Sequence, residues 1–356
     1  MAKMDYGKVF IVGAGPGNPK LLTLRAIECL KQADVILHDR LIPKEVLQLY
    51  APSARYIYVG KKASFHTVPQ DEIAKMMEKE ARNKKRVVRL KGGDPYIFGR
   101  GGEEAEYLAD KGISFEVIPG VSSAFAVPSF AGVPLTHREF TPSIAIVTGH
   151  ENPKKPDTVP YQHGKERKAS TWVHWPSLAK MGTVVFLMGV GNLRANMAAL
   201  KKHGKKGNTP VAFIRWGSLG KQQTVLGTID TIADQVKEMQ LTAPAIIVVG
   251  GVAGLSKKLN WFERGSLHGQ SFLITRDVEG NQVLADALLQ ESAHVIRWPS
   301  FKFIDLRLSS KAKTELKKIS KYDWLIFSSK RAVDSFLKQY IKCGLHLLYH
   351  FLIYKI

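Results

Sequence analysis

The sequence has little cysteine, a deficit of acidic residues and no long hydrophobic run. Cys29 and Cys343 are too few to hold a chain of 356 residues together through disulfides, and such usage is typical of a reducing compartment. The longest apolar stretches, residues 245–255 and 345–354, are shorter than the ~18–20 residues that a transmembrane helix requires. Residues 1–8 are polar, and the apolar run that follows breaks at Gly13, which argues against a signal peptide. We therefore expect a soluble cytoplasmic protein without a membrane partner.

Acidic side chains are outnumbered by basic ones. The chain has 52 Lys and Arg against 31 Asp and Glu, so its formal net charge is +21. A positive charge of this size attracts polyanions. Nucleic acid, a membrane surface and a poly-carboxylate metabolite are all compatible partners. General use of lysine at the surface, with no such partner, explains the charge as well. Disorder is excluded for most of the chain because 45% of the residues are hydrophobic and they occur in regular runs.

Short apolar runs alternate with helical patterns in the first part of the chain. This alternation predicts right-handed crossovers and a largely parallel sheet. The expected strands are residues 9–12, 34–38, 56–59, 86–90 and 115–118, and the expected helices are residues 21–31, 71–82 and 103–111.

The pattern changes near residues 135–142 and again after residues 261–265. A second α/β lobe is expected after the first change, with a polar surface loop at residues 151–168. Its expected strands are residues 143–148, 183–188, 210–214, 223–226 and 245–249, and its helices residues 193–202 and 229–239. The last part contains expected strands at residues 272–275, 294–298 and 324–328 and helices at residues 282–290, 312–319 and 332–338. The predicted domains are residues 1–137, 138–263 and 268–356.

A glycine-rich turn follows the first predicted strand at residues 13–19. A dinucleotide fingerprint requires a third glycine where this chain has Asn18, and Pro16 lacks an N–H that a pyrophosphate would accept. Glycines at a strand end let a ligand approach the bare backbone. The turn therefore suits a nucleoside without phosphates, although a purely structural turn is also compatible with it.

Two further turns follow strands of the same predicted sheet. Residues 91–102 contain five glycines, with Asp94 and with Arg100 placed to meet a carboxylate. Residues 118–124 lead into a helix through Ser122 and Ser123, of which ordinary N-capping explains one. Three such turns at one carboxyl edge predict a crevice for a small molecule.

A set of motifs carries a family resemblance. They are residues 12–17, 38–41, 60–62, 66–70, 92–104, 119–124 and 134–138. Across about residues 6–262 the chain resembles the uroporphyrinogen-III C-methyltransferases of the tetrapyrrole methylase family. The resemblance implies a homodimer of two-lobed α/β chains with the active site in the cleft between the lobes. It also implies transfer of two methyl groups from S-adenosylmethionine to uroporphyrinogen III, giving S-adenosylhomocysteine and precorrin-2 for siroheme or cobalamin biosynthesis.

The resemblance also assigns the methyl-donor site. The matching residues are Pro16, Gly92, Gly93, Asp94, Ile97, Ser122, Ser123, Met188, Gly217 and, for contact with adenine, Ala245. Without the resemblance, Met188 is interpreted by default as a core methionine.

Asp39 and Lys61 match the family's proton acceptor and proton donor. Methylation of a pyrrole carbon leaves a cationic ring that must lose a proton, so a nearby carboxylate helps the reaction. Asp39 is otherwise a turn residue at a strand end, and Lys61 a solvated lysine. Basic side chains near the crevice are expected to bind the substrate's carboxylates, which explains part of the charge better than nucleic acid does. They are Arg40, His66, Arg100, His137 and Arg138.

Other readings of these residues stay open. His66 and His137 are equally compatible with structural roles, and no metal site is expected because His163 and His174 have no partners in register. Asn18 and His38 depart from the family pattern. The alternative functions are a related corrinoid or rRNA methyltransferase, or a non-catalytic tetrapyrrole-binding protein.

Residues 272–276, 298–299 and 322–333 resemble the start of uroporphyrinogen-III synthase. This resemblance implies a partial C-terminal α/β domain fused to the methyltransferase. Because the sequence given stops at Ile356, we expect this segment to fold poorly and to lack synthase activity.

Overall fold

The computed structural model describes residues 6–60, 68–150, 158–162, 165–168, 172–277, 280–304 and 306–344. The chain divides into two compact units, Met1–Trp298 and Pro299–Ile356. Within the described residues, no helix is long and apolar enough to cross a membrane.

The first lobe is built on a five-stranded sheet in the order β3-β2-β4-β1-β5. Every neighbouring pair in it is parallel, as the alternating pattern predicts. Its strands are β1 (Val9–Gly13), β2 (Val35–His38), β3 (Arg55–Tyr58), β4 (Val87–Lys91) and β5 (Phe115–Ile118). All five carboxyl ends therefore meet at one edge of the sheet, where the turns after β1, β4 and β5 also lie.

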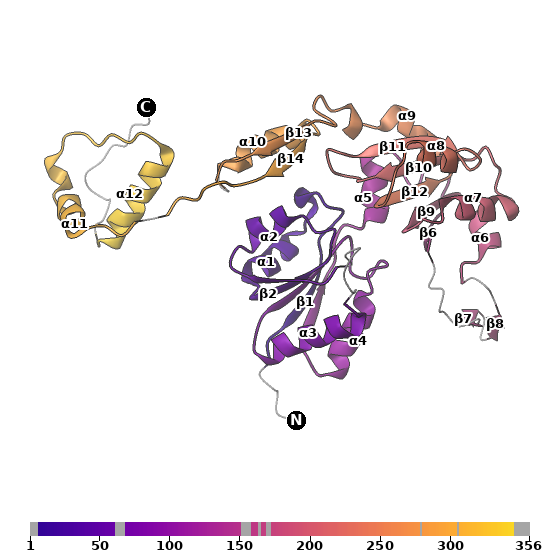
Figure 1. Cartoon of the computed structure of the whole chain (residues 1–356), viewed down its shortest axis with the longest axis horizontal. Coiled ribbons are helices and arrows are strands. Elements are labelled where there is room, and N and C mark those ends of the chain that lie inside the picture. Colours follow the sequence, from indigo (N-terminus) through magenta and orange to yellow (C-terminus); the bar gives the residue numbers. More distant parts are fainter. Residues whose placement is uncertain are drawn as a thin grey trace. The chain divides into compact units, whose positions relative to one another are not determined.

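Helices cover both faces of this sheet (Figure 1). Alternate strand residues point to opposite faces, so Val12 and Leu90 pack with α1 and α2, whereas Ile11 and Val87 pack with α3 and α4. These helices are α1 (Leu24–Gln32), α2 (Lys44–Tyr50), α3 (Gln70–Arg82) and α4 (Gly101–Asp110). The predicted start of α1 at residue 21 is wrong, because Thr23 Oγ1 accepts the N–H of Ala26 at 3.1 Å and caps the helix later.

The second lobe contains a mixed sheet in the order β11-β10-β12-β9-β6. Only β6 and β9 are parallel among its described pairs. Its strands are β6 (Ile144–Thr148), β9 (Thr183–Leu187), β10 (Pro210–Arg215), β11 (Gln223–Thr228) and β12 (Ala245–Val249). Strands β9 and β12 are antiparallel, so the end of β9 and the start of β12 lie at one edge.

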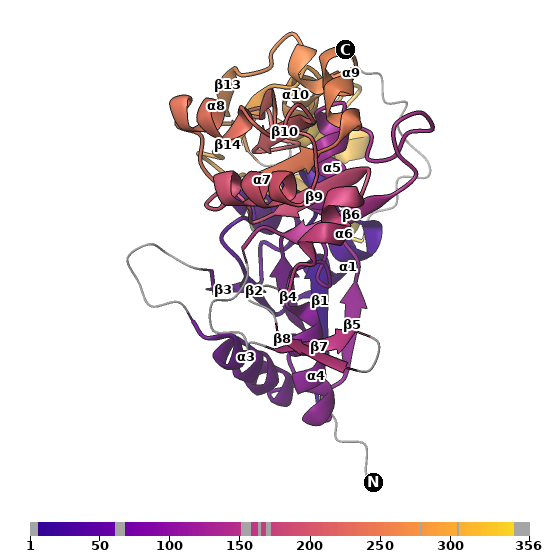
Figure 2. The same cartoon turned by 90° about the vertical axis from the view of Figure 1, so that its right-hand side faces the viewer.

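Helix α5 (Ser123–Phe130) connects the lobes, since it follows β5 but packs on the second sheet. Ala124 and Val127 lie in one core with Val185 and Ala212. The opposite face is covered by α6 (Trp175–Lys180), α7 (Leu193–Lys202) and α8 (Ile232–Glu238), and α9 (Ser256–Leu259) follows β12. Figure 2 shows the two lobes with α5 at their junction. Ser256 Oγ donates to the carbonyl of Ala131 at 2.6 Å and ties the end of the second lobe to α5.

The prediction of a loop at residues 151–168 is wrong for part of that segment. Strands β7 (Thr158–Gln162) and β8 (Lys165–Lys168) pair antiparallel there. The first of them contains Thr, Val and Tyr, which favour strands even in a polar sequence.

The synthase-like segment begins within the first unit. Strands β13 (Ser271–Ile274) and β14 (His294–Arg297) are parallel and are joined by α10 (Asn281–Gln290). The second unit contains α11 (Ser310–Lys317) and α12 (Lys330–Lys342). The predicted strand at residues 324–328 is wrong: no strand occurs among the described residues of 299–344, and Trp324 and Ile326 are 79% and 84% exposed. A strand needs a partner for its main-chain groups, and none of the described residues there provides one.

Candidate active site

The three glycine-rich turns of the first lobe meet. Gly93 N donates to the carbonyl of Gly15 at 2.7 Å, and Gly15 N donates to the carbonyl of Gly93 at 3.1 Å. The third turn is tied to the second because Gly120 N donates to Asp94 Oδ2 at 3.1 Å. Asp94 Oδ1 accepts the N–H of Tyr96 at 2.8 Å, so this one carboxylate organises two turns. The predicted convergence is therefore a feature of the fold.

The close approach of these turns requires glycine. A Cβ on Gly120 would lie 2.3 Å from the carbonyl oxygen of Gly93, and Gly93 itself has a left-handed φ of 69°. Gly92 differs, because a Cβ there would meet only Leu41, at 3.9 Å. Gly92 therefore leaves open space beside the backbone, where a ligand can approach.

Other candidate donor residues are distributed over both lobes. Pro16, Gly92–Asp94, Ser122 and Ser123 belong to the three turns, with Ser122 Oγ capping α5 through the N–H of Ala124 at 3.3 Å. Ile97 is 38% exposed in the second turn.

The remaining three, Met188, Gly217 and Ala245, lie at one edge of the second sheet. Met188 is 55% exposed and has a φ of 54°, a left-handed conformation unusual for methionine. Gly217 packs against α5, where a Cβ would lie 2.3 Å from Val127 Cγ1. The donor candidates thus combine bare backbone with exposed apolar side chains, which suits a nucleoside without phosphates better than a nucleotide.

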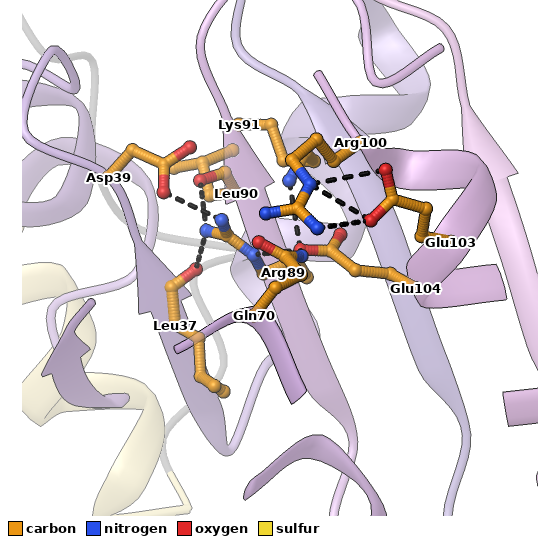
Figure 3. A network of polar contacts seen from close by, with 9 residues as sticks. All are labelled: Leu37, Asp39, Gln70, Arg89, Leu90, Lys91, Arg100, Glu103 and Glu104. Carbon is orange, nitrogen blue, oxygen red and sulfur yellow. Dashed lines mark hydrogen bonds and ion pairs between the residues drawn. The ribbon is translucent and has the colours of Figure 1, made fainter. Parts of the chain in front are cut away.

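Asp39 belongs to a network of charged side chains at the same edge of the first sheet (Figure 3). Arg89, whose side chain is 3% exposed, donates from Nη2 to Asp39 Oδ1 at 2.6 Å and from Nε to Glu104 Oε1 at 3.0 Å. Glu104 Oε1 also accepts Lys91 Nζ at 2.9 Å and Gln70 Nε2 at 2.6 Å. The buried guanidinium of Arg89 therefore holds the carboxylate of Asp39 at the end of β2.

Burial affects the pKa values of the two cationic side chains in this network, Lys91 and Arg89. Burial, assisted by the neighbouring Arg89, lowers the pKa of Lys91. For Arg89, burial is outweighed by Glu104 and Asp39, which raise the pKa of the guanidinium. Arg89 therefore stays charged and gives Asp39 a permanent ion-pair partner.

Sequence reasoning did not select Gln70, Arg89, Lys91 or Glu104 for this role. A signal was present, since Arg89 and Lys91 alternate with Val88 and Leu90 in a strand whose five residues are all buried. Charged residues at alternate positions of such a strand need buried partners on one face.

The candidate substrate residues lie in different environments. Arg40 and Arg138 are exposed, and Arg100 donates from Nε to Glu103 Oε2 at 2.9 Å. His137 Nδ1 accepts the N–H of Glu139 at 3.2 Å, and its ring centroid lies 5.0 Å from that of Phe140, which supports the structural alternative for this histidine. Lys61 and His66 lie outside the described residues. No group of metal-ligating side chains occurs in the described part of the chain.

Comparison with known proteins assigns the two parts of the chain. Residues 8–233 match the family of tetrapyrrole (corrin/porphyrin) methylases, and residues 282–346 match uroporphyrinogen-III synthase HemD. A uroporphyrinogen-III C-methyltransferase of Bacillus subtilis (strain 168) is 39% identical over 94% of this chain, which spans only 66% of that protein's length.

Two further proteins match the first part. The S-adenosyl-L-methionine-dependent uroporphyrinogen III methyltransferase of Methanosarcina barkeri (strain Fusaro / DSM 804) is 48% identical over 70% of this chain and 94% of its own. The crystal structure of uroporphyrin-III C-methyl transferase from Thermus thermophilus, complexed with S-adenyl homocysteine, has a TM-score of 0.57 and 36% identity over 70% of this chain and all of its own. The chain described here belongs to the tetrapyrrole methylase family.

Proposed function

We propose that this chain transfers methyl groups from S-adenosylmethionine to two ring carbons of uroporphyrinogen III, giving precorrin-2 for siroheme or cobalamin. The observation that carries the proposal is the meeting of the three turns at the sheet edge where Arg89 also holds Asp39. The names of the Methanosarcina and Thermus relatives support the same substrate and donor.

The residues at the crevice fit the donor. Open space beside Gly92 leaves room for it, and the exposed side chains of Ile97 and Met188 offer apolar contacts. S-adenosylmethionine supplies an electrophilic methyl group on a sulfonium sulfur. The chain's part is to hold the donor and the reacting ring carbon in line, because orientation lowers the barrier of a two-substrate reaction. Pro16, Gly92–Asp94, Ser122, Ser123, Gly217 and Ala245 are proposed to complete the donor site.

Asp39 is proposed to accept the proton that the methylated ring carbon releases. A carboxylate held by the guanidinium of Arg89 stays in place while the ring carries its positive charge. Lys61, the proposed proton donor, lies outside the described residues.

Exposed cations are proposed to bind the substrate's carboxylates. Arg40, Arg100 and Arg138 are exposed and lie outside the helices and strands, and charge-assisted hydrogen bonds from them would fix the macrocycle. His66 is proposed to contribute to substrate binding, whereas the contacts of His137 favour a structural role.

An assay with purified protein, S-adenosylmethionine and uroporphyrinogen III tests the function, with the absorbance of the oxidised product as readout. We expect Asp39→Ala to bind S-adenosylmethionine as the unchanged protein does and to lose about 100-fold or more in turnover. Asp34→Asn is the control, because Asp34 pairs with Arg86 away from the network and is expected to keep its turnover. Unchanged turnover of a folded Asp39→Ala variant would refute the role of Asp39.

We further propose a cytoplasmic homodimer with domains at residues 1–137, 138–263 and 268–356. Two free cysteines support a reducing compartment. Light scattering coupled to size-exclusion chromatography tests the dimer. A measured mass equal to that of a single chain would refute it.

We also propose that the synthase-like segment is inactive as a synthase. In the second unit, Ile319 and Tyr340 are the hydrophobic side chains buried among the described residues, so little core supports an active site there. Formation of the type-III isomer from hydroxymethylbilane would overturn this proposal.

A further inference from the structure

A cavity of about 470 Å³ lies in the first unit where three parts of the chain meet. The turns after β1 and β2 contribute one wall, and residues 216, 218–221 and 243–244 of the second lobe contribute another. Residues 289, 293–295 and 297 of the synthase-like segment form the third. None of the candidate donor-binding residues lines it. Gly17, Trp216 and Pro244 do line it, and each adjoins a candidate donor residue in the sequence, so the cavity lies beside the donor residues. Its volume is in the range of small-molecule sites.

The wall from the synthase-like segment is fixed by specific contacts. Lys20 Nζ pairs with Asp286 Oδ1 at 3.1 Å, and Gly269 N donates to the carbonyl of Gly220 at 3.0 Å. A Cβ on Gly220 would lie 2.2 Å from the main chain of Ala293, so the two surfaces are in close backbone contact. The segment is thus packed against the methylase lobes at this place.

The cavity is rich in positive charge. Arg40 of the first lobe, Lys221 of the second lobe and Arg297 of β14 all line it. None of the three has an ion-pair partner within the described residues, whereas Glu45 is the acidic side chain in the wall. Burial raises the pKa of Glu45 against the opposing effects of Arg297 and Lys221, so this one carboxylate offsets only part of the positive charge. Burial, with Arg215 nearby, lowers the pKa of Lys221 against the opposing effect of Glu45.

Apolar groups occupy the space between these cations. Leu41, Leu289 and Val295 line the cavity, and Lys221 Nζ lies 3.8 Å from the ring centroid of Trp216. A small inorganic anion would leave this apolar surface unused. Flat apolar rings that carry several carboxylates match both features.

We propose that this cavity binds the carboxylate arms and pyrrole rings of a poly-carboxylated tetrapyrrole, and that Arg297 of the synthase-like segment binds it together with Arg40 and Lys221. The inference rests on the proposed function, because it takes the methylase's own substrate class as the ligand. The synthase-like segment then contributes a substrate-binding wall to the methylase. Arg297 Nη1 also donates to Gln282 Oε1 at 2.9 Å, which orients its guanidinium.

Substitution of Arg297 in the full chain tests the proposal. We expect Arg297→Ala to raise the KM for uroporphyrinogen III about tenfold, with kcat and the KM for S-adenosylmethionine within about twofold of the unchanged protein. Arg297→Lys keeps the charge and should raise that KM less. Arg276→Ala is the control, since Arg276 is an exposed arginine of the same segment that does not line the cavity.

Equilibrium binding separates this inference from the proposed function. Fluorescence titration with uroporphyrin III, the oxidised and unreactive analogue, needs no turnover, and its Kd should also rise about tenfold in Arg297→Ala. If the unchanged protein does not methylate uroporphyrinogen III but the Kd still rises in Arg297→Ala, the proposed function is refuted and the proposed binding site stands. Equal Kd and KM for folded Arg297→Ala and the unchanged protein overturn the site. If Arg297→Lys and Arg297→Ala raise the Kd equally and both unfold at a lower temperature than the unchanged protein, Arg297 has a structural role only. That result also overturns the proposed site.

Discussion

The guanidinium of Arg89 joins Asp39 to the buried Glu104, with Nη2 2.6 Å from Asp39 Oδ1 and Nε 3.0 Å from Glu104 Oε1. Three donors converge on that single oxygen of Glu104, while its Oε2 has no hydrogen-bond partner among the described residues. The position of Asp39 therefore depends on a carboxylate that lies on α4. Arg89 is a positioning residue, since it acts on the reaction through Asp39.

Replacing Arg89 should impair turnover more than donor binding. We expect Arg89→Met to lower kcat by about 10- to 100-fold, because a carboxylate that loses its anchor leaves the reacting geometry. Arg89→Lys keeps the charge but cannot reach both carboxylates in the same way, so its rescue should be partial. Steady-state kinetics and calorimetry with S-adenosylmethionine give the two readouts. A loss of donor affinity as large as the loss of kcat would show that Arg89 supports the fold rather than Asp39.

Replacing Glu104 should destabilise the first lobe. Glu104→Gln removes the counterion of the buried Lys91 and one of the two counterions of the buried Arg89, and breaking such a buried arrangement costs about 3–5 kcal/mol. Urea unfolding of the full chain measures this loss. The control is Glu103→Gln, because Glu103 pairs with Arg100 at the surface, where an ion pair contributes about 1 kcal/mol or less. Equal unfolding midpoints for the two variants would contradict the expected role of Glu104.

The parts of the fold that could be predicted are those determined by local pattern. The buried run Val9–Gly13 followed by glycines predicts a strand and a turn, and parallel topology then places that turn beside Gly93 and Gly120. The convergence of the turns follows from strand order and from the absence of side chains at a few positions. The sequence displays the glycines directly and predicts a parallel sheet, whereas the strand order comes from the structure.

Long-range pairing could not be predicted in the same way. Asp39 and Arg89 are 50 residues apart, and their contact depends on β2 and β4 being neighbours in the sheet. Strand β7 is predicted as part of a polar loop because its pairing partner, β8, consists of charged residues alone. At residues 324–328 a strand is predicted where the structure has none. The apolar pattern of this segment is typical of a strand, but the described residues around it provide no pairing partner.

A methyl group on Gly120 should separate the turns. The Cβ of Gly120→Ala would lie 2.3 Å from the carbonyl oxygen of Gly93, so main-chain atoms must move. We expect the affinity for S-adenosylmethionine, measured by calorimetry, to fall at least about tenfold, which is 1.4 kcal/mol of binding free energy.

Gly102→Ala is the matched control for this change. No atom lies within 4 Å of a Cβ at Gly102, and alanine is favoured over glycine in a helix such as α4 by up to about 1 kcal/mol. This variant should bind the donor normally and unfold at the same or a higher temperature. Donor binding by Gly120→Ala at the affinity of Gly102→Ala would contradict the proposed donor site.

The ion pairs of Glu116 should make stability depend on pH in the acid range. Glu116 accepts Arg25 Nε at 2.9 Å and Lys8 Nζ at 2.8 Å, and these bonds lower the pKa of Glu116 to about 2. A carboxyl group with a lowered pKa in the folded state stabilises the fold above its unfolded pKa, and this contribution is lost as the pH falls toward 2. Glu116→Gln should therefore be less stable than the unchanged protein at pH 7, by about 1 kcal/mol or less because the pairs are largely exposed. The difference should shrink below pH 4.5 and at high salt. Thermal unfolding of both proteins from pH 7 to pH 3 measures it, and a difference that grows as the pH falls would contradict the assignment.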